Sequence, residues 1–266
     1  MRSASLLVAL FLFIGLAGCH SSQPLPRLAV HTLQPGDDTL QLASASGFDS
    51  VVQVFPWREV EPTQDQFHWE ATDRFVAGAE YHGLALIVRL DQHPAWASPV
   101  DLSLNAPPEK LEDYEDYVRR VVERYRGRLA GIILWNEPNL AIEWGGDPPD
   151  PIAFTELLCA GYQAAKGADP NLVVAAAALA PTNNNDLAAT DDRLFLRQMY
   201  RSGAGDCFDV LAAHPYSFGL PPDAPQLDRQ HPAFSRLVDL RQIMLDNDDG
   251  DKPVWITEMG WTVDPP

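Results

Sequence analysis

The sequence predicts an α/β fold, a (β/α)8 TIM barrel truncated after its seventh strand, and three observations predict it. Short β-rich apolar runs alternate with amphipathic stretches from Arg27 onward, which is the pattern of repeated βα units around a parallel sheet. There are seven such runs. Polar or aromatic residues, rather than simple turns, follow most of them, as expected where the carboxyl ends of barrel strands build a site.

Taken in chain order, the predicted strands are short and rich in valine, isoleucine, leucine and alanine. They are Leu28 to Leu33, Val51 to Phe55, Leu84 to Leu90, Leu129 to Trp135, Leu172 to Ala177, Phe208 to Ala213, and Pro253 to Thr257. Between them, apolar residues at three- and four-residue spacing predict a helix from Leu111 to Arg126. A further helix is expected to start at Asp150 and Pro151 and to stop at Gly167 and Pro170.

A parallel barrel brings the carboxyl ends of all its strands to one face, and the loops there build the site. A doubly wound open sheet also collects ligands at carboxyl ends, but it needs a glycine-rich first turn for phosphate, and residues 34–38 ("QPGDD") do not provide one. The barrel is therefore preferred over the open sheet.

Two of the predicted strands end in glutamate, at Glu137 and at Glu258. Strand alternation puts Glu258 in phase with Val254, and Glu137 in phase with Ile133 and Trp135, so both carboxylates are expected to point toward the barrel axis. The two glutamates lie 121 residues apart, which fits three βα units and assigns them to strands four and seven.

Three motifs carry a resemblance to a known group of enzymes: "WNEPN" at residues 135–139, "HPY" at 214–216 and "WITEMGW" at 255–261. With these motifs, over about residues 28 to 264, the chain resembles the retaining glycoside hydrolases of clan A, nearest to family 39 and its bacterial relatives. The resemblance implies hydrolysis of O-glycosidic bonds by two glutamates, without a cofactor.

The same resemblance assigns roles to individual residues. It implies that Glu137 is the general acid/base, that Glu258 is the nucleophile and that Asn136 contacts the sugar 2-hydroxyl. His214 and Tyr216 match positions that contact the catalytic carboxylates. The alternative for Glu137 and Glu258 is a pair of structural carboxylates, which would be costly to bury without partners.

Other side chains are weaker candidates. Trp96, Trp144 and Trp261 follow strand ends and could form walls on which sugar rings stack, whereas Trp69, Trp135 and Trp255 are expected to pack in the core. Arg89 could orient the nucleophile or sugar hydroxyls, or could pair with Asp91. His93 resembles positions that line the sugar site, although a single histidine is more often structural. The weaker acid candidates are Glu59, Glu61, Glu143 and Asp147, of which the last two are expected to meet substrate or solvent.

The N-terminus has the pattern of a targeting segment. Arg2 precedes an apolar stretch from Leu6 to Leu16 that is too short to span a bilayer comfortably. Residues 16–19 ("LAGC") resemble the bacterial lipobox. We therefore expect a signal peptide at 1–18, a lipidated Cys19 with a polar linker at 19–26, and a barrel domain at 27–266, anchored in the bacterial cell envelope outside the cytoplasm.

Composition excludes several other classes of protein. The formal charge of −18 opposes binding to nucleic acid or to anionic lipid. Beyond Cys19 only Cys159 and Cys207 remain, too few for a zinc cluster, so no metal site is expected. An oxidising compartment would permit a disulfide between them, but two separate buried thiols remain equally open.

Only eight residues follow Glu258, so an eighth strand is missing from the sequence and we expect that it represents a truncated reading of a longer gene. Two functions remain open. The chain is either a lipid-anchored retaining glycosidase acting on an extracellular or envelope glycan, or a carbohydrate-binding lipoprotein that has lost turnover. The presence of both glutamates favours the enzyme.

Overall fold

The computed structural model describes residues 28–32, 36–225 and 232–261. These residues form one sheet of seven parallel strands in the order β1 to β7, each paired with its neighbours in the sequence. The strands are β1 Ala29–Thr32, β2 Ser50–Pro56, β3 Ala85–Asp91, β4 Gly131–Leu134, β5 Val174–Ala176, β6 Val210–Ala213 and β7 Val254–Ile256. The seven predicted strands are confirmed.

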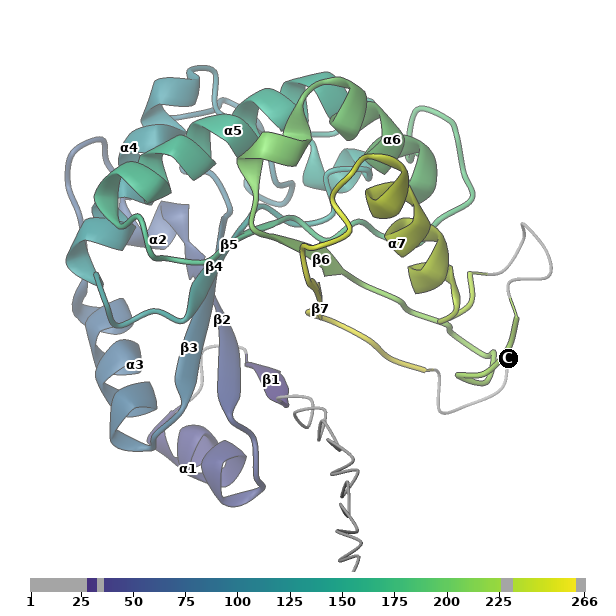
Figure 1. Cartoon of the computed structure of the whole chain (residues 1–266). Coiled ribbons are helices and arrows are strands. Elements are labelled where there is room, and N and C mark those ends of the chain that lie inside the picture. Colours follow the sequence, from purple (N-terminus) through teal and green to yellow (C-terminus); the bar gives the residue numbers. More distant parts are fainter. Residues whose placement is uncertain (1–27, 33–35, 226–231, 262–266) are drawn as a thin grey trace, which may run out of the picture.

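The sheet curls into part of a barrel, with the helices along its convex side (Figure 1). The helices are α1 Asp37–Ala45, α2 Trp57–Val60, α3 Glu70–Tyr81, α4 Leu111–Arg124, α5 Pro151–Ala168, α6 Asp192–Arg201 and α7 Arg236–Asp246, with the 3-10 turns η1 Ala141–Glu143 and η2 Ala204–Cys207. Within the described residues β1 and β7 are the two edges of the sheet, as predicted for a (β/α)8 fold that lacks its eighth strand.

The two sequence-predicted helices form for the expected reasons. In α4 the buried side chains recur at three- and four-residue spacing and face the sheet. In α5 the Asp150 carboxylate accepts hydrogen bonds from the backbone N–H groups of Ile152 and Ala153, and Pro151 occupies the first turn, where its missing N–H costs nothing. These capping interactions fix where α5 begins, directly after the loop that follows β4.

Two apolar layers hold the curled sheet. The larger layer lies between the sheet and the helices, and the smaller one fills the concave side with side chains from neighbouring strands, such as Ala175 of β5 and Ala212 of β6. Trp255 of β7 reaches across this interior to β4, where a Cβ atom on Gly131 would lie 2.9 Å from its ring. The indole therefore fills the barrel in place of a larger residue at position 131.

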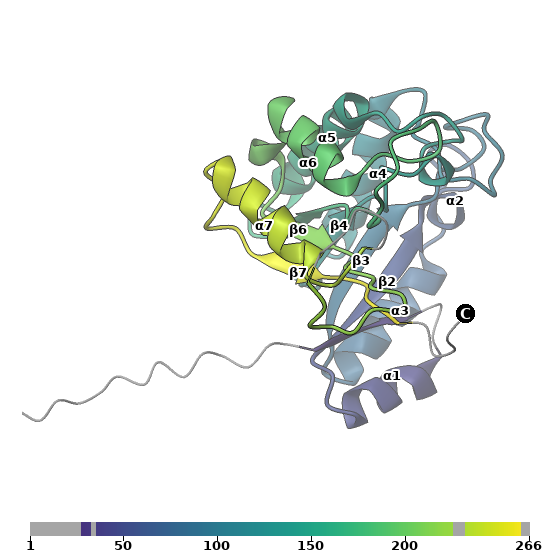
Figure 2. The same ribbon diagram turned by 90° about the vertical axis from the view of Figure 1, so that its right-hand side faces the viewer.

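Loops that follow β3 and β4 gather on one side of the sheet, at the carboxyl ends of the strands (Figure 2). They are joined by backbone hydrogen bonds, from the Asn105 N–H to the Ile142 carbonyl and from the Gly145 N–H to the Asn105 carbonyl. This face carries the polar residues that the sequence places after the strands.

Candidate active site

The end of β4 turns sharply, and this turn presents Asn136 and Glu137. Trp135 and Glu137 have φ angles of 76° and 38°, in the left-handed region that costs a non-glycine residue about 1–3 kcal/mol. Glu137 is held there because its backbone N–H donates to the Ala178 carbonyl at 3.0 Å. The prediction that Trp135 shares a face with Ile133 is wrong: Ile133 lies in the barrel interior, while Trp135 packs among the helices.

The end of β7 also departs from simple alternation. Val254 packs against the helical layer and Trp255 against the interior, so the predicted phase of Glu258 with Val254 does not explain its direction. After Ile256 the chain leaves the regular strand, although the Thr257 N–H still donates to the Ala213 carbonyl at 3.1 Å. The carboxylate of Glu258 nevertheless reaches the polar centre of the site.

His214, which follows β6, lies between the two glutamates. Its Nδ1 is 2.8 Å from Glu137 Oε1, and its Nε2 is 3.7 Å from Glu258 Oε1. The imidazole is 3% exposed, while the side chains of Glu137 and Glu258 are 19% and 26% exposed. The carboxylates can therefore be reached from solvent, whereas the histidine that fixes them is buried.

Glu258 is surrounded by groups that stabilise its ionised form. Arg89 Nη1 donates to Oε1 at 3.0 Å, the Tyr216 hydroxyl donates to Oε2 at 2.9 Å, and His31 Nε2 lies 3.9 Å from Oε1. Burial alone would raise the pKa of Glu258, but His214, Arg89, the Tyr216 hydrogen bond and His31 together hold that pKa below its ordinary value of 4.5. A carboxylate that stays ionised in this way is suited to act as a nucleophile.

Arg89 serves both of the purposes that the sequence left open. Its Nη1 also donates to Asn136 Oδ1 at 3.0 Å, and its Nε lies 2.9 Å from Oδ2 of Asp91, which is 1% exposed. Burial raises the pKa of Asp91, and the charge of Arg89 opposes that rise. Arg89 thus links a buried carboxylate beneath the site to Glu258 at its centre.

Glu143 holds the other end of Asn136. Its carboxylate accepts from the side-chain amides of Asn136 and Asn105, both at 3.1 Å. The expectation that Glu143 meets substrate or solvent is therefore corrected, since its side chain orients Asn136 and joins the loops after β3 and β4. Burial raises the pKa of Glu143, opposed by the hydrogen bond from Asn105.

Sequence reasoning did not assign His31, Asn105 or the positioning contact of Glu143 to the site. A signal was present only for His31, a titratable residue within the apolar run of the first strand, at the position that pairs with Val52. The contacts of Asn105 and Glu143 join loops that are distant in sequence and leave no local pattern.

One of the aromatic candidates is corrected. Trp144 is 5% exposed and packs edge-on against Trp135 and Phe154, so it belongs to the core and does not form a sugar-stacking wall. Trp96 packs edge-on against Trp57, with the ring centroids 5.5 Å apart, and its indole N–H donates to the Glu61 backbone carbonyl at 2.8 Å. Trp96 thus fastens the rim of the barrel, but its side chain is only half-buried and its contact with a sugar ring stays a prediction.

His93 is also corrected. The side chain is fully buried, its Nδ1 accepts from the Ala106 N–H at 3.0 Å and its Nε2 lies 3.2 Å from the Val100 carbonyl. Both ring nitrogens are thus satisfied within the loop after β3, and the residue is structural. Trp261, in contrast, is 38% exposed and lies in the loop after β7 that also carries Glu258.

Cys159 of α5 and Cys207 of η2 form a disulfide, with their Cα atoms 4.8 Å apart, which resolves the alternative that the sequence left open. In the described part of the chain no group of three or more metal-ligating side chains comes together. No described helix is long and apolar enough to cross a membrane. The predicted signal peptide, Cys19 and the linker lie outside the described residues.

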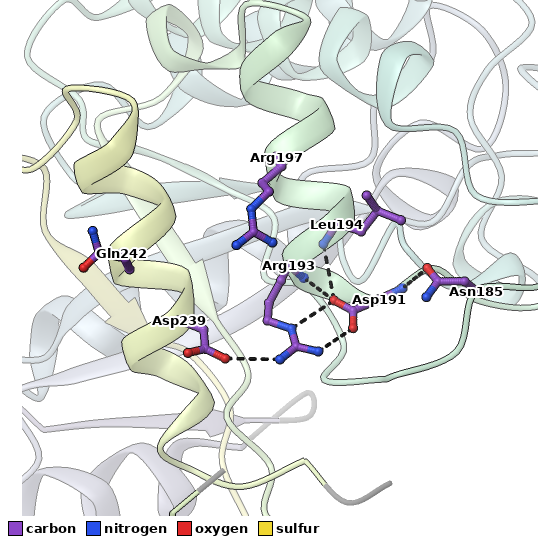
Figure 3. Close-up of a pocket in the computed structure, with 7 residues that line it drawn as sticks. All are labelled: Asn185, Asp191, Arg193, Leu194, Arg197, Asp239 and Gln242. Carbon is purple, nitrogen blue, oxygen red and sulfur yellow. Dashed lines mark hydrogen bonds and ion pairs between the residues drawn. The ribbon is translucent and has the colours of Figure 1, made fainter. Parts of the chain in front are cut away.

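The larger pockets lie away from the glutamates. One of about 430 Å³ lies between α6 and α7, where Arg193 pairs with Asp191 and Asp239 (Figure 3). Close by, the guanidinium of Arg236, 1% exposed, pairs with Asp192. These ion pairs fasten α7 to the start of α6, and we interpret them as structural.

No family model matches the chain, and no curated protein matches it significantly. Solved structures do. A family 39 glycoside hydrolase from Bacteroides cellulosilyticus WH2 superimposes with a TM-score of 0.68 at 22% identity, over 88% of this chain and 48% of that one. A family 39 beta-xylosidase from Caulobacter crescentus superimposes with a TM-score of 0.63 at 19% identity, over 90% of this chain and 54% of the beta-xylosidase. The chain has the fold of these glycoside hydrolases.

A family 10 endoxylanase retrieved from a sugarcane soil metagenome has the same fold, with a TM-score of 0.57 at 16% identity, over 90% of this chain and 68% of the endoxylanase. The chain spans about half the length of the family 39 structures that it matches. The predicted (β/α)8 barrel architecture is confirmed by these comparisons.

Proposed function

We propose that this chain is a retaining glycoside hydrolase in which Glu258 is the nucleophile and Glu137 the general acid/base. One observation carries the proposal: glutamates from the ends of β4 and β7 lie against the two nitrogens of one buried histidine. The fold shared with solved glycoside hydrolases supports it.

In the first step Glu258 attacks the anomeric carbon while Glu137 gives its proton to the oxygen of the departing sugar, which leaves a covalent glycosyl ester on Glu258. In the second step Glu137 takes a proton from water, and the resulting hydroxide attacks the same carbon and releases Glu258. Arg89 and Tyr216 keep Glu258 ionised before attack through the contacts described above.

Asn136 binds the sugar 2-hydroxyl in this proposal. Its Oδ1 accepts from Arg89 and its Nδ2 donates to Glu143, which fixes the orientation of the amide. The amide nitrogen carries a second hydrogen, which is left to donate to the 2-hydroxyl. This bond strengthens as the oxocarbenium-like transition state forms.

We further propose that the protein acts outside the cytoplasm, held in the cell envelope by lipid on Cys19. The disulfide between Cys159 and Cys207 fits an oxidising compartment, because such bonds are rare in the cytosol. Metabolic labelling with a radioactive fatty acid tests the anchor: the chain should be labelled, and Cys19→Ala should abolish the label and release the protein from membranes. Equal labelling of both would refute the assignment.

Release of reducing ends from a panel of plant and bacterial polysaccharides tests the activity, using soluble protein that starts after Cys19. Glu258→Ala should abolish release, whereas Glu123→Gln, a change at a surface carboxylate that is 49% exposed, should not alter it. The competing function is a carbohydrate-binding lipoprotein without turnover. Folded protein that binds a glycan but releases no reducing ends would favour that alternative.

A further inference from the structure

A trough runs along the outer face of α6, away from the two glutamates. It consists of the pocket of about 430 Å³ between α6 and α7 and of a second pocket, of about 640 Å³, between α6 and the start of α5. Asn185 and Leu194 line both pockets, so the two adjoin. We call the two pockets together the α6 trough. Their volumes are typical of pockets that bind small ligands.

Two arginines of the α6 trough have no acidic partner. Arg197 lines the first pocket and Arg201 the second, both are exposed, and among the described residues neither side chain has a hydrogen-bond or ion-pair partner. Four residues apart on one helix, they share a face, with Cβ atoms about 5–6 Å apart. Figure 3 shows the Arg197 guanidinium in the space between α6 and α7. An uncommitted guanidinium offers a planar fork of N–H donors that suits an anionic group.

The acidic groups of the trough are already neutralised. Arg193 pairs with Asp191 at 2.7 Å and with Asp239 at 3.2 Å. Asp150 accepts hydrogen bonds at the first turn of α5, at the positive end of the helix dipole. The net charge of −18 acts from a distance, and at physiological salt exposed charges more than about 8 Å apart are largely screened. Contacts within the trough therefore decide which ligand binds there.

The α6 trough adjoins the loop that positions the general acid/base. Thr190 lines the second pocket, and its backbone N–H donates to the Asn139 carbonyl at 2.9 Å. Asn139 lies two residues after Glu137. Ile142 and Leu187, which are 57% and 77% exposed, lie on the same pair of loops. A trough at this place serves a ligand long enough to extend beyond the glutamates.

We propose that the α6 trough is a secondary binding site for a glycan whose anionic groups, uronate carboxylates or sulfate esters, pair with Arg197 and Arg201. This inference rests on the proposed carbohydrate substrate and adds its class, an acidic polysaccharide. When one part of a polymer is bound in the trough, its other sugar units stay near the glutamates, which raises their effective concentration there. A short substrate cannot occupy both places, so the trough acts on polymers alone.

Binding to the full chain carrying Glu258→Gln, which prevents turnover, tests the secondary site. We would titrate tetragalacturonate, a sulfated galactan tetrasaccharide and neutral cellotetraose, and measure Kd by calorimetry at low and at high salt. At least one acidic tetramer should bind, more weakly at high salt because exposed charges are screened. The tetramer that binds identifies the anionic group.

Substitutions locate that binding on the protein. Arg197→Gln and Arg201→Gln should each weaken binding of the acidic tetramer about tenfold. Arg126→Gln, the same change of charge at an exposed arginine that follows α4, should not alter it. In an active enzyme, Arg197→Gln should raise KM for the acidic polymer and leave kcat/KM for a short aryl glycoside unchanged.

Three results would overturn the proposal: no binding of either acidic tetramer, acidic binding that both arginine substitutions leave unchanged, or equal weakening of cellotetraose binding. Hydrolysis by the chain without Glu258→Gln is measured separately. Arginine-dependent binding without hydrolysis of any glycan would contradict the proposed enzyme and leave the secondary site standing. Hydrolysis without binding of either acidic tetramer would leave the enzyme standing and contradict the secondary site.

Discussion

Replacing Tyr216 by phenylalanine removes one hydroxyl from the site and leaves the ring in place. The hydroxyl donates to Glu258 Oε2 at 2.9 Å, and it remains protonated through the neutral range because burial, first of all, raises the pKa of Tyr216 to about 12. It therefore stabilises the ionised form of Glu258 throughout the neutral pH range.

The size of the effect follows from the bond that is lost. A hydrogen bond to a charged group contributes about 1.5–3 kcal/mol, and one pKa unit corresponds to about 1.36 kcal/mol. Because Tyr216 is partly open to solvent, we take the lower end, a rise of about one unit in the pKa of Glu258. The pKa of Glu258 lies below its ordinary value in the folded protein, so loss of the donor moves it upward.

The assay is the pH dependence of kcat/KM for hydrolysis of an aryl glycoside. Ionisation of Glu258 sets the acidic limb of this profile if Glu258 is the nucleophile. In Tyr216→Phe the acidic limb should move about one unit to higher pH, with little change in the basic limb. An unchanged acidic limb with lower kcat at all pH values would refute the reasoning, since Tyr216 would then not control the charge of Glu258.

The remaining predictions concern stability and specificity. Reducing the disulfide of Cys159 and Cys207, which are 48 residues apart, should lower the free energy of unfolding by about 4 kcal/mol in urea titrations; a loss under about 1 kcal/mol would contradict its stabilising role. Arg236→Met should lower the free energy of unfolding by about 3–5 kcal/mol because it leaves buried carboxylates without their partner. Arg128→Met, at an exposed ion pair, should lower it by less than about 1 kcal/mol. Equal losses in the two variants would show that burial does not matter. Asn136→Ala should lower kcat/KM for a glycoside about 10²-fold, which corresponds to about 3 kcal/mol, but should hardly affect kcat/KM for its 2-deoxy analogue. Equal losses on both substrates would show that Asn136 does not bind the 2-hydroxyl.

The repeating βα pattern predicted the architecture because each strand and helix is specified by local periodicity. The runs ending at Trp135 and Thr257 were recognisable as strands, and the glutamates at their ends were recognisable from the motifs around them. The direction of Glu137 was not, because the positive φ angles at Trp135 and Glu137 break the alternation that a regular strand would keep. The direction of Glu258 was not, because the chain leaves the regular strand after Ile256.

Side chains in loops were the harder part. His93 and Trp144 sit at positions that suit a ligand site, but their burial depends on how loops fold against α5 and against each other. Glu143 acquires its role from Asn105, which is 38 residues away. Such contacts are set by tertiary packing and leave no periodic trace in the sequence.

Trapping of the glycosyl-enzyme tests the central claim most directly. The protein would be incubated with a panel of 2-deoxy-2-fluoro glycosides that carry a good leaving group, digested, and mapped by mass spectrometry, and the anomeric configuration of the first product from an ordinary substrate would be followed by NMR. The account predicts a sugar attached to Glu258 and a product of retained configuration. Attachment to Glu137, or an inverted product, would contradict it.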